Sequence, residues 1–322
     1  MCANYLSLAT FGPSSSAPLR PTLARMRYVD YNEAMATLSP AAAVEAVRDA
    51  LLSGFDPATD PQRQKVALPH GEMHLLPSAL DGAVGVKVLG IQPPGSTVDV
   101  PLVQGSYLLM GGETLTPEWL IDAAALTTLR TPAVAVAGVL SLLDDPVNAV
   151  IFGTGAQGRG HAATLEDLLD VSCTFVSRTR PEDLSYPWAE AGTSAADDAV
   201  AGAGLVVTAT SSPSPILNAE HLRDDAIILA VGAHTTDTRE LGSDVLAGAQ
   251  VIVEDVAAAK REAGDVAIAV EEGALSWGDV VTMADVVRGD VSLDTSRRIV
   301  FKTVGMPWED LAVARALAAA AS

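Results

Sequence analysis

The chain has 322 residues, 49% of them hydrophobic and 19% charged, and its formal net charge is −20 at pH 7. This length is enough for two domains that each bury a core. The acidic balance excludes nucleic-acid binders that neutralise phosphates with a basic surface, and no apolar run reaches the roughly 20 residues of a membrane span.

Residues 1–25 contain prolines and the triplet Ser14-Ser15-Ser16 but lack the basic start and apolar stretch of a secretory signal. They are interpreted as a disordered extension, or as a start site assigned too early, with the folded pattern opening at Met26. Because Cys2 lies in this stretch, a disulfide with Cys173 is not expected. A reducing compartment fits this usage, and we predict a cytoplasmic protein.

The first part of the chain has a β-rich pattern. Ser39-Pro40 before an amphipathic stretch, with Gly54 after it, predicts a capped helix. A polar loop at 56–65 follows, and then short strands are expected around a turn at His70-Gly71 and before the breaker Pro93-Pro94-Gly95. These strands are predicted at residues 66–68, 73–76 and 84–89.

From about residue 131 strands and helices alternate. Short apolar runs typical of a buried parallel sheet occur at residues 149–152, 173–176, 205–208, 227–231 and 251–253. Helical or loop segments separate them, including a helix at 161–169, and an Ala-rich helix closes the chain at 307–321. This rhythm predicts an α/β fold with a doubly wound Rossmann domain.

A glycine-rich turn joins the first of these strands to the next helix. Gly153 permits the tight turn, Gly155 lets a pyrophosphate approach the backbone, and Gly158 allows close packing of helix and strand. The helix N-terminus offers free N–H groups and a positive dipole end to the phosphates. The predicted cofactor-binding residues of the turn are Gly153, Thr154, Gly155, Ala156, Gln157 and Gly158.

The next strand ends at Val176, where an NAD-specific site carries an acidic residue for the ribose 2′-hydroxyl. This chain has Ser177, Arg178, Thr179 and Arg180 there instead. Guanidinium groups suit a 2′-phosphate, so the sequence favours NADP(H) over NAD(H). The alternative is a glycine turn that serves packing alone, with surface arginines behind it.

Six ordered segments make the chain resemble the ornithine cyclodeaminase/mu-crystallin family from Met26 onward. They are Gly85-Val86-Lys87-Val88, Leu126-Thr127-Thr128-Leu129-Arg130-Thr131, the glycine turn with Gln157, Val206-Val207-Thr208-Ala209-Thr210-Ser211, Gly232-Ala233-His234 through Arg239-Glu240-Leu241, and Phe301-Lys302-Thr303-Val304-Gly305.

The resemblance implies a two-domain homodimer with its active site between the domains. A β-rich α+β domain for substrate binding and dimerisation would comprise residues 26–130 and 302–322, and a Rossmann NAD(P)-binding domain residues 131–301. The family also places a strand around 119–121 and a helix after it, although Thr116-Pro117-Glu118 resembles a helix start. We follow the family at this point.

By the same resemblance, Arg63, Lys87 and Arg130 hold the substrate carboxylate. Lys87 lies within an apolar strand, where an unpaired ammonium is costly, so we expect an anionic partner for it. Arg130 precedes Thr131-Pro132, interpreted as a helix cap and first turn, which would set a guanidinium beside a positive helix end. The alternatives are a Lys87 amine that reaches water, a structural salt bridge of Arg130 and a solvated Arg63.

His234 occupies the position where family cyclodeaminases carry an aspartate that handles substrate protons. A histidine there can relay a proton near neutral pH, and Asp237 is a second acid/base candidate. The alternative is a histidine that only forms hydrogen bonds within its own loop. By resemblance, Val304 and Gly305 close over the nicotinamide, and further cofactor contacts come from Thr208, Ala209, Thr210 and Ser211.

The remaining titratable residues are less informative. His70 and His74 flank the predicted β-turn and are expected at the surface. No group of His, Cys, Asp and Glu has metal-ligand spacing, so no metal is expected.

Together these patterns predict an NADP(H)-dependent reductase of imino acids, or an amino-acid dehydrogenase in the reverse direction. Two alternatives stay open. One is an ornithine or lysine cyclodeaminase with a recycled cofactor, and the other is a non-enzymatic protein that binds NADPH and a small ligand. For the enzymatic hypotheses the expected partner is a small amino-acid or imino-acid substrate.

Overall fold

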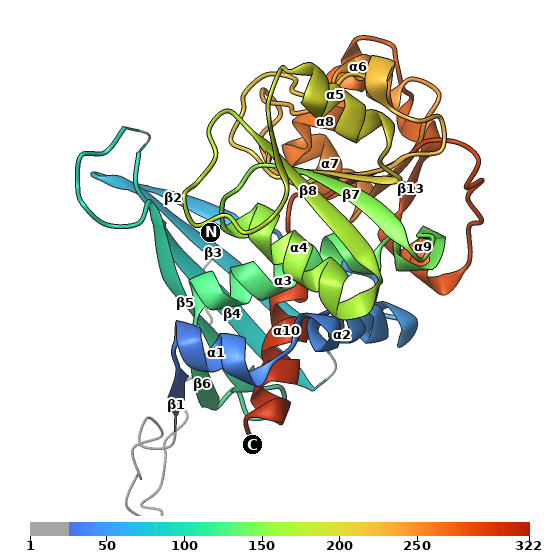
Figure 1. Cartoon of the computed structure of the whole chain (residues 1–322). Helices are drawn as coiled ribbons and strands as arrows, with labels where there is room; N and C mark the ends of the chain where they lie inside the picture. The colour runs from blue at the N-terminus through green and yellow to red at the C-terminus, as the bar shows by residue number, and fades with distance from the viewer. Residues whose placement is uncertain (1–25, 81, 94) are drawn as a thin grey trace, which may run out of the picture.

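The protein was analysed as a computed structural model, which describes residues 26–80, 82–93 and 95–322. The predicted extension at 1–25, with Cys2, lies outside the described residues. The chain forms two sheets with helices packed around and between them (Figure 1). One sheet has six strands and belongs to the first part of the chain, and the other has eight strands and belongs to the second.

The six-stranded sheet has the order β1-β6-β5-β4-β3-β2. It is antiparallel except that β1 runs parallel to β6. Its strands are β1 (Arg27–Val29), β2 (Gln64–Leu68), β3 (Gly71–Leu80), β4 (Ala83–Ile91), β5 (Val103–Gly111) and β6 (Pro117–Asp122). The expected β-rich pattern is confirmed, and so is the strand around 119–121 that the family resemblance implied.

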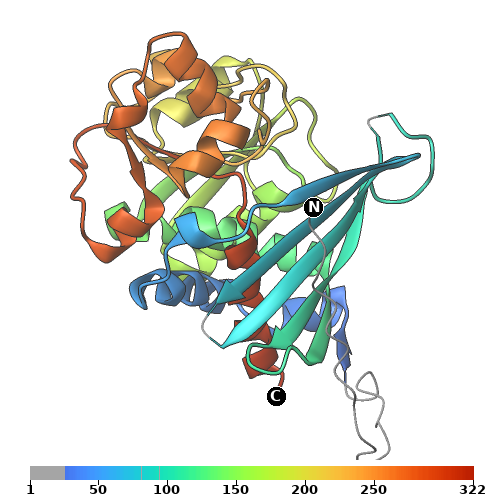
Figure 2. The ribbon, with the colours of Figure 1, turned by 180° about the vertical axis from the view of Figure 1, so that it is seen from behind.

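Helices cover one face of this sheet. The C-terminal helix α10 (Pro307–Ala320) packs against β3 and β4, and α3 (Ala123–Ala137) packs against β5. On their outer side lie α1 (Tyr31–Thr37) and α2 (Pro40–Leu52), whose N-terminus Ser39 caps as predicted by accepting a bond from Ala42 N. Figure 2 shows the other face, over which no helix of the described residues lies.

The eight-stranded sheet is parallel throughout, with the order β13-β12-β14-β11-β10-β7-β8-β9. Its central strands are short, apolar and fully buried, as predicted for a sheet covered on both faces. The eight strands of the sheet are β7 (Val147–Phe152), β8 (Val171–Ser177), β9 (Trp188–Glu190), β10 (Leu205–Thr208), β11 (Ile227–Ala230), β12 (Gln250–Val253), β13 (Val280–Thr282) and β14 (Ile299–Lys302).

The connections between these strands complete a doubly wound fold. Its helices are α4 (Ala156–Leu168), α5 (Ser194–Ala201), α6 (Ser243–Leu246), α7 (Val256–Glu262), α8 (Gly264–Glu271) and α9 (Met283–Arg288). Single 3-10 turns lie at Pro57–Thr59, Leu140–Leu142, Ala219–His221 and Trp277–Asp279.

The interpretation of Thr131-Pro132 as a helix start is wrong. Asp122 caps α3 by accepting from Ala125 N, and Pro132 lies inside the helix. Proline removes one internal hydrogen bond, but burial of nearly the whole helix stabilises it through tertiary packing. The predicted domain limits at 130/131 and 301/302 therefore fall inside α3 and β14 rather than between elements.

The stretch Ala123–Leu142 is long and apolar enough, by composition, to cross a membrane, which corrects the expectation that no such run exists. However, 72% of its most apolar window is buried within the protein. It contains α3, which packs against α2, α4 and α10. The stretch is therefore accounted for as a core helix.

Candidate active site

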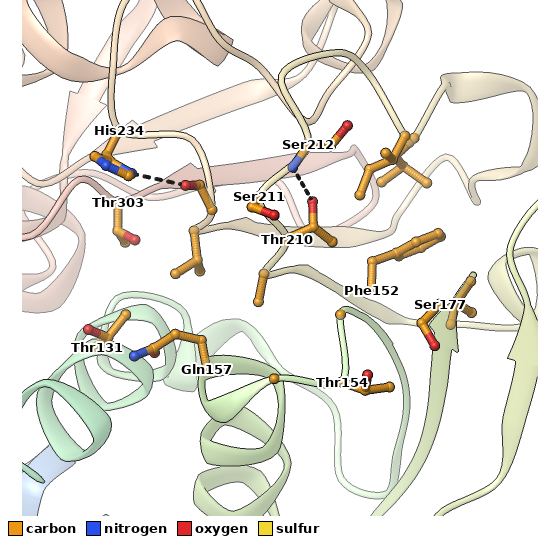
Figure 3. Close-up of a pocket in the computed structure, with 18 of the residues that line it drawn as sticks. Thr131, Phe152, Thr154, Gln157, Ser177, Thr210, Ser211, Ser212, His234 and Thr303 are labelled. Carbon is orange, nitrogen blue, oxygen red and sulfur yellow. Dashed lines mark hydrogen bonds between the residues drawn. The ribbon is translucent and has the colours of Figure 1, made fainter. Parts of the chain in front are cut away.

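A cavity of about 1300 Å³ opens at the carboxyl ends of the central parallel strands. Its lining comes from both sheets and from α3, and the volume is sufficient for a dinucleotide together with a small substrate. In Figure 3, Thr131 and Gln157 lie on one side of the cavity and His234 and Thr303 on the other. A ligand at this place meets the edge where open α/β sheets bind their cofactors.

The glycine turn has the geometry that a dinucleotide requires. β7 ends at Phe152, and Gly155 precedes the first residue of α4. A Cβ on Gly153 would collide with the carbonyl of Ala209, and one on Gly158 with the carbonyl of Gly153. Gly155 instead faces open space and lines the cavity. Packing therefore requires two of the glycines, and the third leaves room for a phosphate beside free helix amides.

Two substitutions separate these roles. Gly158→Ala is expected to lower the free energy of unfolding by about 2 kcal/mol, because the added methyl meets backbone. Gly155→Ala is expected to leave stability unchanged and to weaken NADPH binding about tenfold, because the methyl occupies the space of the pyrophosphate. Thermal unfolding and fluorescence titration with NADPH measure both effects. Equal destabilisation by the two variants would contradict this assignment.

At the end of β8 the structure brings Ser177 and Arg178 to the cavity lining, whereas Thr179 and Arg180 lie outside it. Ser177 Oγ donates to Thr179 O at 2.8 Å and accepts from Trp188 Nε1 at 2.8 Å. Arg178 is exposed. Thr179 lies next to the lining but not in it, and its predicted cofactor contact stays a prediction.

The opposite end of the cavity holds two arginines that approach the same turn. Arg63 donates to the carbonyls of Val304, at 3.0 Å, and Gly305, and pairs with Glu262 at 3.1 Å. Arg130 also lies against Gly305, where a Cβ would collide with its guanidinium. Both arginines, Val304 and Gly305 line the cavity. A carboxylate at this end therefore meets two guanidinium groups.

Carboxylates of α10 compensate the positive charge of this end. Arg130 Nη1 lies 3.2 Å from Glu309 Oε2, and its Nε lies 3.4 Å from Asp310 Oδ1. The pKa of Glu309 is raised well above its ordinary value by burial and by the nearby Glu254, to which it bonds. Glu254 in turn accepts from the amides of Val304 and Gly305. The raised pKa of Glu309 favours its protonated form, and Asp310 is the second carboxylate that Arg130 contacts.

Lys87 has the anionic partner that the apolar strand predicted. Its Nζ lies 2.6 Å from Asp310 Oδ2, and the residue is 1% exposed, so its amine does not reach water. Burial lowers the pKa of Lys87 to about 8, against the opposing effect of Asp310. Lys87 is not among the residues that line the cavity, and its predicted contact with the substrate stays a prediction. Lys87 forms an ion pair with Asp310, and Arg130 contacts the same carboxylate.

Glu309 and Asp310 were missed by the sequence interpretation, which treated the C-terminal helix as plain. The available signal was an acidic pair between Trp308 and Leu311 in an otherwise Ala-rich helix. Both residues are fully buried. Only the partnership with a buried lysine from β4 shows why these charges are tolerated.

His234 reaches the cavity and Asp237 does not. The exposed side chain of His234 lines it and bonds the carbonyl of Gly232 through Nδ1 at 3.1 Å (Figure 3). Asp237 is exposed outside the lining, and a hydrogen bond from Thr235 lowers its pKa. The structure therefore does not bring Asp237 to the cavity, and its acid/base role stays a prediction.

The strand ends beside His234 supply the remaining predicted cofactor residues. Ala209, Thr210 and Ser211 line the cavity. Thr208 does not, because it is fully buried and donates to Glu240 at 3.0 Å. The structure therefore places Thr208 behind the cavity wall, and its predicted cofactor contact stays a prediction.

His74 is a cavity residue that the sequence interpretation assigned to the surface. It is 8% exposed, lines the cavity, and pairs through Nε2 with Glu72 at 2.9 Å. The signal was alternation along β3, where His74, Leu76, Ser78 and Leu80 are buried in turn. With this residue, the substrate end has a wall lined by His74, Leu89, Ile91 and Val103.

Comparison with known proteins identifies the family. The profile of the ornithine cyclodeaminase/mu-crystallin family matches residues 28–322. The chain belongs to this family. It is 30% identical to ketimine reductase mu-crystallin of Mus musculus, over 78% of this chain and 80% of the relative. It is 28% identical to delta(1)-pyrroline-2-carboxylate reductase 2 of Burkholderia ambifaria, over 89% of this chain and 90% of the relative.

The family fold is also seen in solved structures. The delta(1)-pyrroline-2-carboxylate reductase of Thermococcus litoralis, solved with NADH and L-proline, superposes with a TM-score of 0.81 at 22% identity, covering 92% of this chain and 97% of that one. This likeness confirms the expected fold, a Rossmann domain joined to a β-rich domain. The roles of the individual site residues stay predictions that rest on the geometry above.

Proposed function

We propose that the chain is a cytoplasmic NAD(P)H-dependent reductase of imino acids, with a cyclic substrate of the pyrroline-2-carboxylate type. The observation that carries this proposal is a dinucleotide-sized cavity whose lining includes Arg63 and Arg130 beside an apolar wall. Similarity to relatives named as pyrroline-2-carboxylate and ketimine reductases supports it. The buried free thiol of Cys173 is consistent with a reducing compartment.

The residues around the cavity have separate roles in substrate binding and catalysis. Arg63 and Arg130 hold the substrate carboxylate with charge-assisted bonds, and so fix the imine carbon. Leu89, Ile91 and Val103 contact the apolar ring and exclude water from it. Bound NAD(P)H supplies a hydride to that carbon. His234 donates from Nδ1 to the carbonyl of Gly232, and its imidazolium form gives the Nε2 proton to the imine nitrogen and becomes the neutral imidazole.

The test is oxidation of NADPH, followed by its absorbance, with delta(1)-pyrroline-2-carboxylate or delta(1)-piperideine-2-carboxylate. We expect saturable turnover and formation of proline or pipecolate. Tight NADPH binding without turnover of either substrate overturns the proposal. Release of ammonia from ornithine, with proline formed and no net change in NADPH, would indicate a cyclodeaminase instead.

We further propose that NADP(H) is preferred over NAD(H). The support is Arg178, which is exposed and lines the cavity directly after β8, where an acidic residue would select NAD. Ser177 lies beside it, with its hydroxyl engaged by Trp188 and Thr179. A 2′-phosphate at the end of β8 would contact the guanidinium of Arg178, and this strand end carries no carboxylate that would repel it.

Arg178→Ala is expected to raise KM for NADPH about tenfold and to change KM for NADH less than twofold, because one charged hydrogen bond to phosphate is lost. Arg180→Ala is the matched control. Arg180 is exposed two residues further on, lies outside the cavity and bonds Leu184 O at 3.4 Å. Equal effects of Arg178→Ala on both cofactors would contradict the preference.

We also propose a homodimer formed through the uncovered face of the six-stranded sheet. In β4 the residues that alternate with Lys87 point to this face, and they are apolar and only half-buried in the single chain. They are Val84, Val86 and Val88. An apolar face of this kind suits a symmetric interface between two copies. Light scattering is expected to give twice the 33.1 kDa of one chain, and a monomer at micromolar concentration would contradict the proposal.

A further inference from the structure

Three charged side chains are buried beneath the loop that carries His234. Glu240 ends this loop, Asp265 lies in α8, and Lys302 ends β14. Their exposed fractions are 0%, 1% and 1%. Charges buried this deeply require partners.

Glu240 ties the ends of two neighbouring strands together. Its Oε1 accepts from the amide and the hydroxyl of Thr210, both at 2.7 Å. Its Oε2 accepts from Thr208 Oγ1 at 3.0 Å and from Gly232 N at 2.6 Å. Each oxygen accepts from one backbone amide and faces one threonine hydroxyl, so the site offers four donors to the carboxylate. This pattern suits a carboxylate group that is shielded from water.

Asp265 and Lys302 form a neutral pair next to it. Asp265 Oδ1 accepts from the amides of Glu240, at 2.7 Å, and Leu241, at 2.9 Å. Lys302 Nζ lies 3.0 Å from Asp265 Oδ2 and donates to the carbonyl of Ala233. One lysine therefore stands against two carboxylates. The cluster has one excess negative charge, which the lysine does not cancel.

The cluster lies directly behind the cavity wall. Thr210 and Gly232, whose amides bond Glu240, both line the cavity, as does His234. Ser177 and Arg178 line it at the end of β8, on the far side of the glycine turn. A dinucleotide that extends from β8 across the turn therefore brings its nicotinamide to the ends of β10 and β11. That ring is cationic when oxidised and uncharged when reduced.

We propose that the buried charge of Glu240 makes this end of the cavity favour the oxidised cofactor over the reduced one, and so favours transfer of the hydride to the substrate. The inference rests on the proposed function. A unit charge about 10 Å away, at an effective dielectric constant of about 20, changes the affinity for a cation on the order of tenfold. Glu240 acts through its electrostatic field and through the hydrogen bonds by which it holds the cavity wall. It is therefore a positioning residue.

The experiment compares dissociation constants of NADPH and NADP⁺, measured by calorimetry without substrate. Glu240→Gln removes the excess charge and is expected to weaken NADP⁺ relative to NADPH on the order of tenfold. Asp265→Asn, which leaves Lys302 and Glu240 to balance each other, is expected to shift the ratio in the same direction. The double variant Lys302→Met/Asp265→Asn removes the neutral pair and keeps the charge of Glu240. Its ratio is expected to stay within about twofold of the original.

The outcomes are distinct. A ratio unchanged in both Glu240→Gln and Asp265→Asn overturns this inference and leaves the proposed function intact. An equal shift in the double variant also overturns it, because looser packing alone would then explain the result. If the unmodified protein binds neither NADPH nor NADP⁺, the proposed function itself fails. Thermal unfolding of each variant establishes that it is folded, and Asp265→Asn retains the acceptor of both amides.

Discussion

Replacement of Arg130 by methionine is expected to lower kcat/KM for an imino acid about 10³-fold. The guanidinium lines the substrate end of the cavity, and two charge-assisted bonds to a carboxylate supply about 4 kcal/mol. Most of the loss is expected in KM, because a carboxylate is bound alike in the ground and transition states. Steady-state kinetics with saturating NADPH measure the effect.

Arg130→Lys is the control for geometry. It retains the positive charge between Glu309 and Asp310 but loses the planar fork. We expect an intermediate loss of about 10²-fold and near-normal stability. Arg130→Met also leaves Asp310 with one cation fewer, so its free energy of unfolding is expected to fall by about 3 kcal/mol. A methionine variant with unchanged KM would show that the substrate carboxylate binds elsewhere.

Local chemistry explains why much of the second sheet was predictable from the sequence. The glycine turn is encoded within six residues, since Gly153 has a positive φ, which favours glycine, and a Cβ on Gly158 would collide with the carbonyl of Gly153. The short apolar strands are buried on both faces, so their composition alone identifies them. The histidine of the β11 loop was placed at the cavity because parallel strands present their carboxyl ends to ligands.

Features decided by distant packing were not predictable in the same way. Pro132 resembled a helix start, and only its burial among α2, α4 and α10 shows why a helix continues through it. Asp310 gained its role from Lys87, a residue 223 positions away in the chain. His74 needed the register of β3 against β4, which sets it opposite Leu89 on the inward face. Each case depends on a tertiary partner that no local pattern specifies.

The charge balance around Asp310 links these features to the reaction. Asp310 forms ion pairs with both Lys87 and Arg130. While Lys87 carries its proton it neutralises Asp310, and Arg130 retains positive charge for the substrate. When Lys87 loses the proton, Asp310 and Arg130 neutralise each other. We therefore expect the protonation of Lys87, outside the cavity, to control the affinity of Arg130 for the substrate carboxylate.

Lys87→Met is expected to lower kcat/KM about 10²-fold at pH 7 and to remove a pH dependence that the unmodified protein shows. The pKa of Lys87 is about 8, lowered chiefly by burial. Substrate affinity of the unmodified protein is therefore expected to fall as pH rises through 8. The ratio of kcat/KM between protein and variant, measured from pH 6 to 10, cancels the titration of the substrate itself. A ratio independent of pH would contradict this role.

Stability is expected to change with pH in the opposite direction. The folded pKa of Lys87, about 8, lies below the ordinary 10.5, so the unfolded chain binds more protons between these values. The free energy of unfolding therefore rises with pH across this window, by up to about 3 kcal/mol from this group. Urea unfolding at pH 8 and pH 10.5 is expected to show this rise in the unmodified protein and not in Lys87→Met. If activity falls with rising pH while the contribution of Lys87 to the free energy of unfolding rises, the buried amine serves function rather than stability.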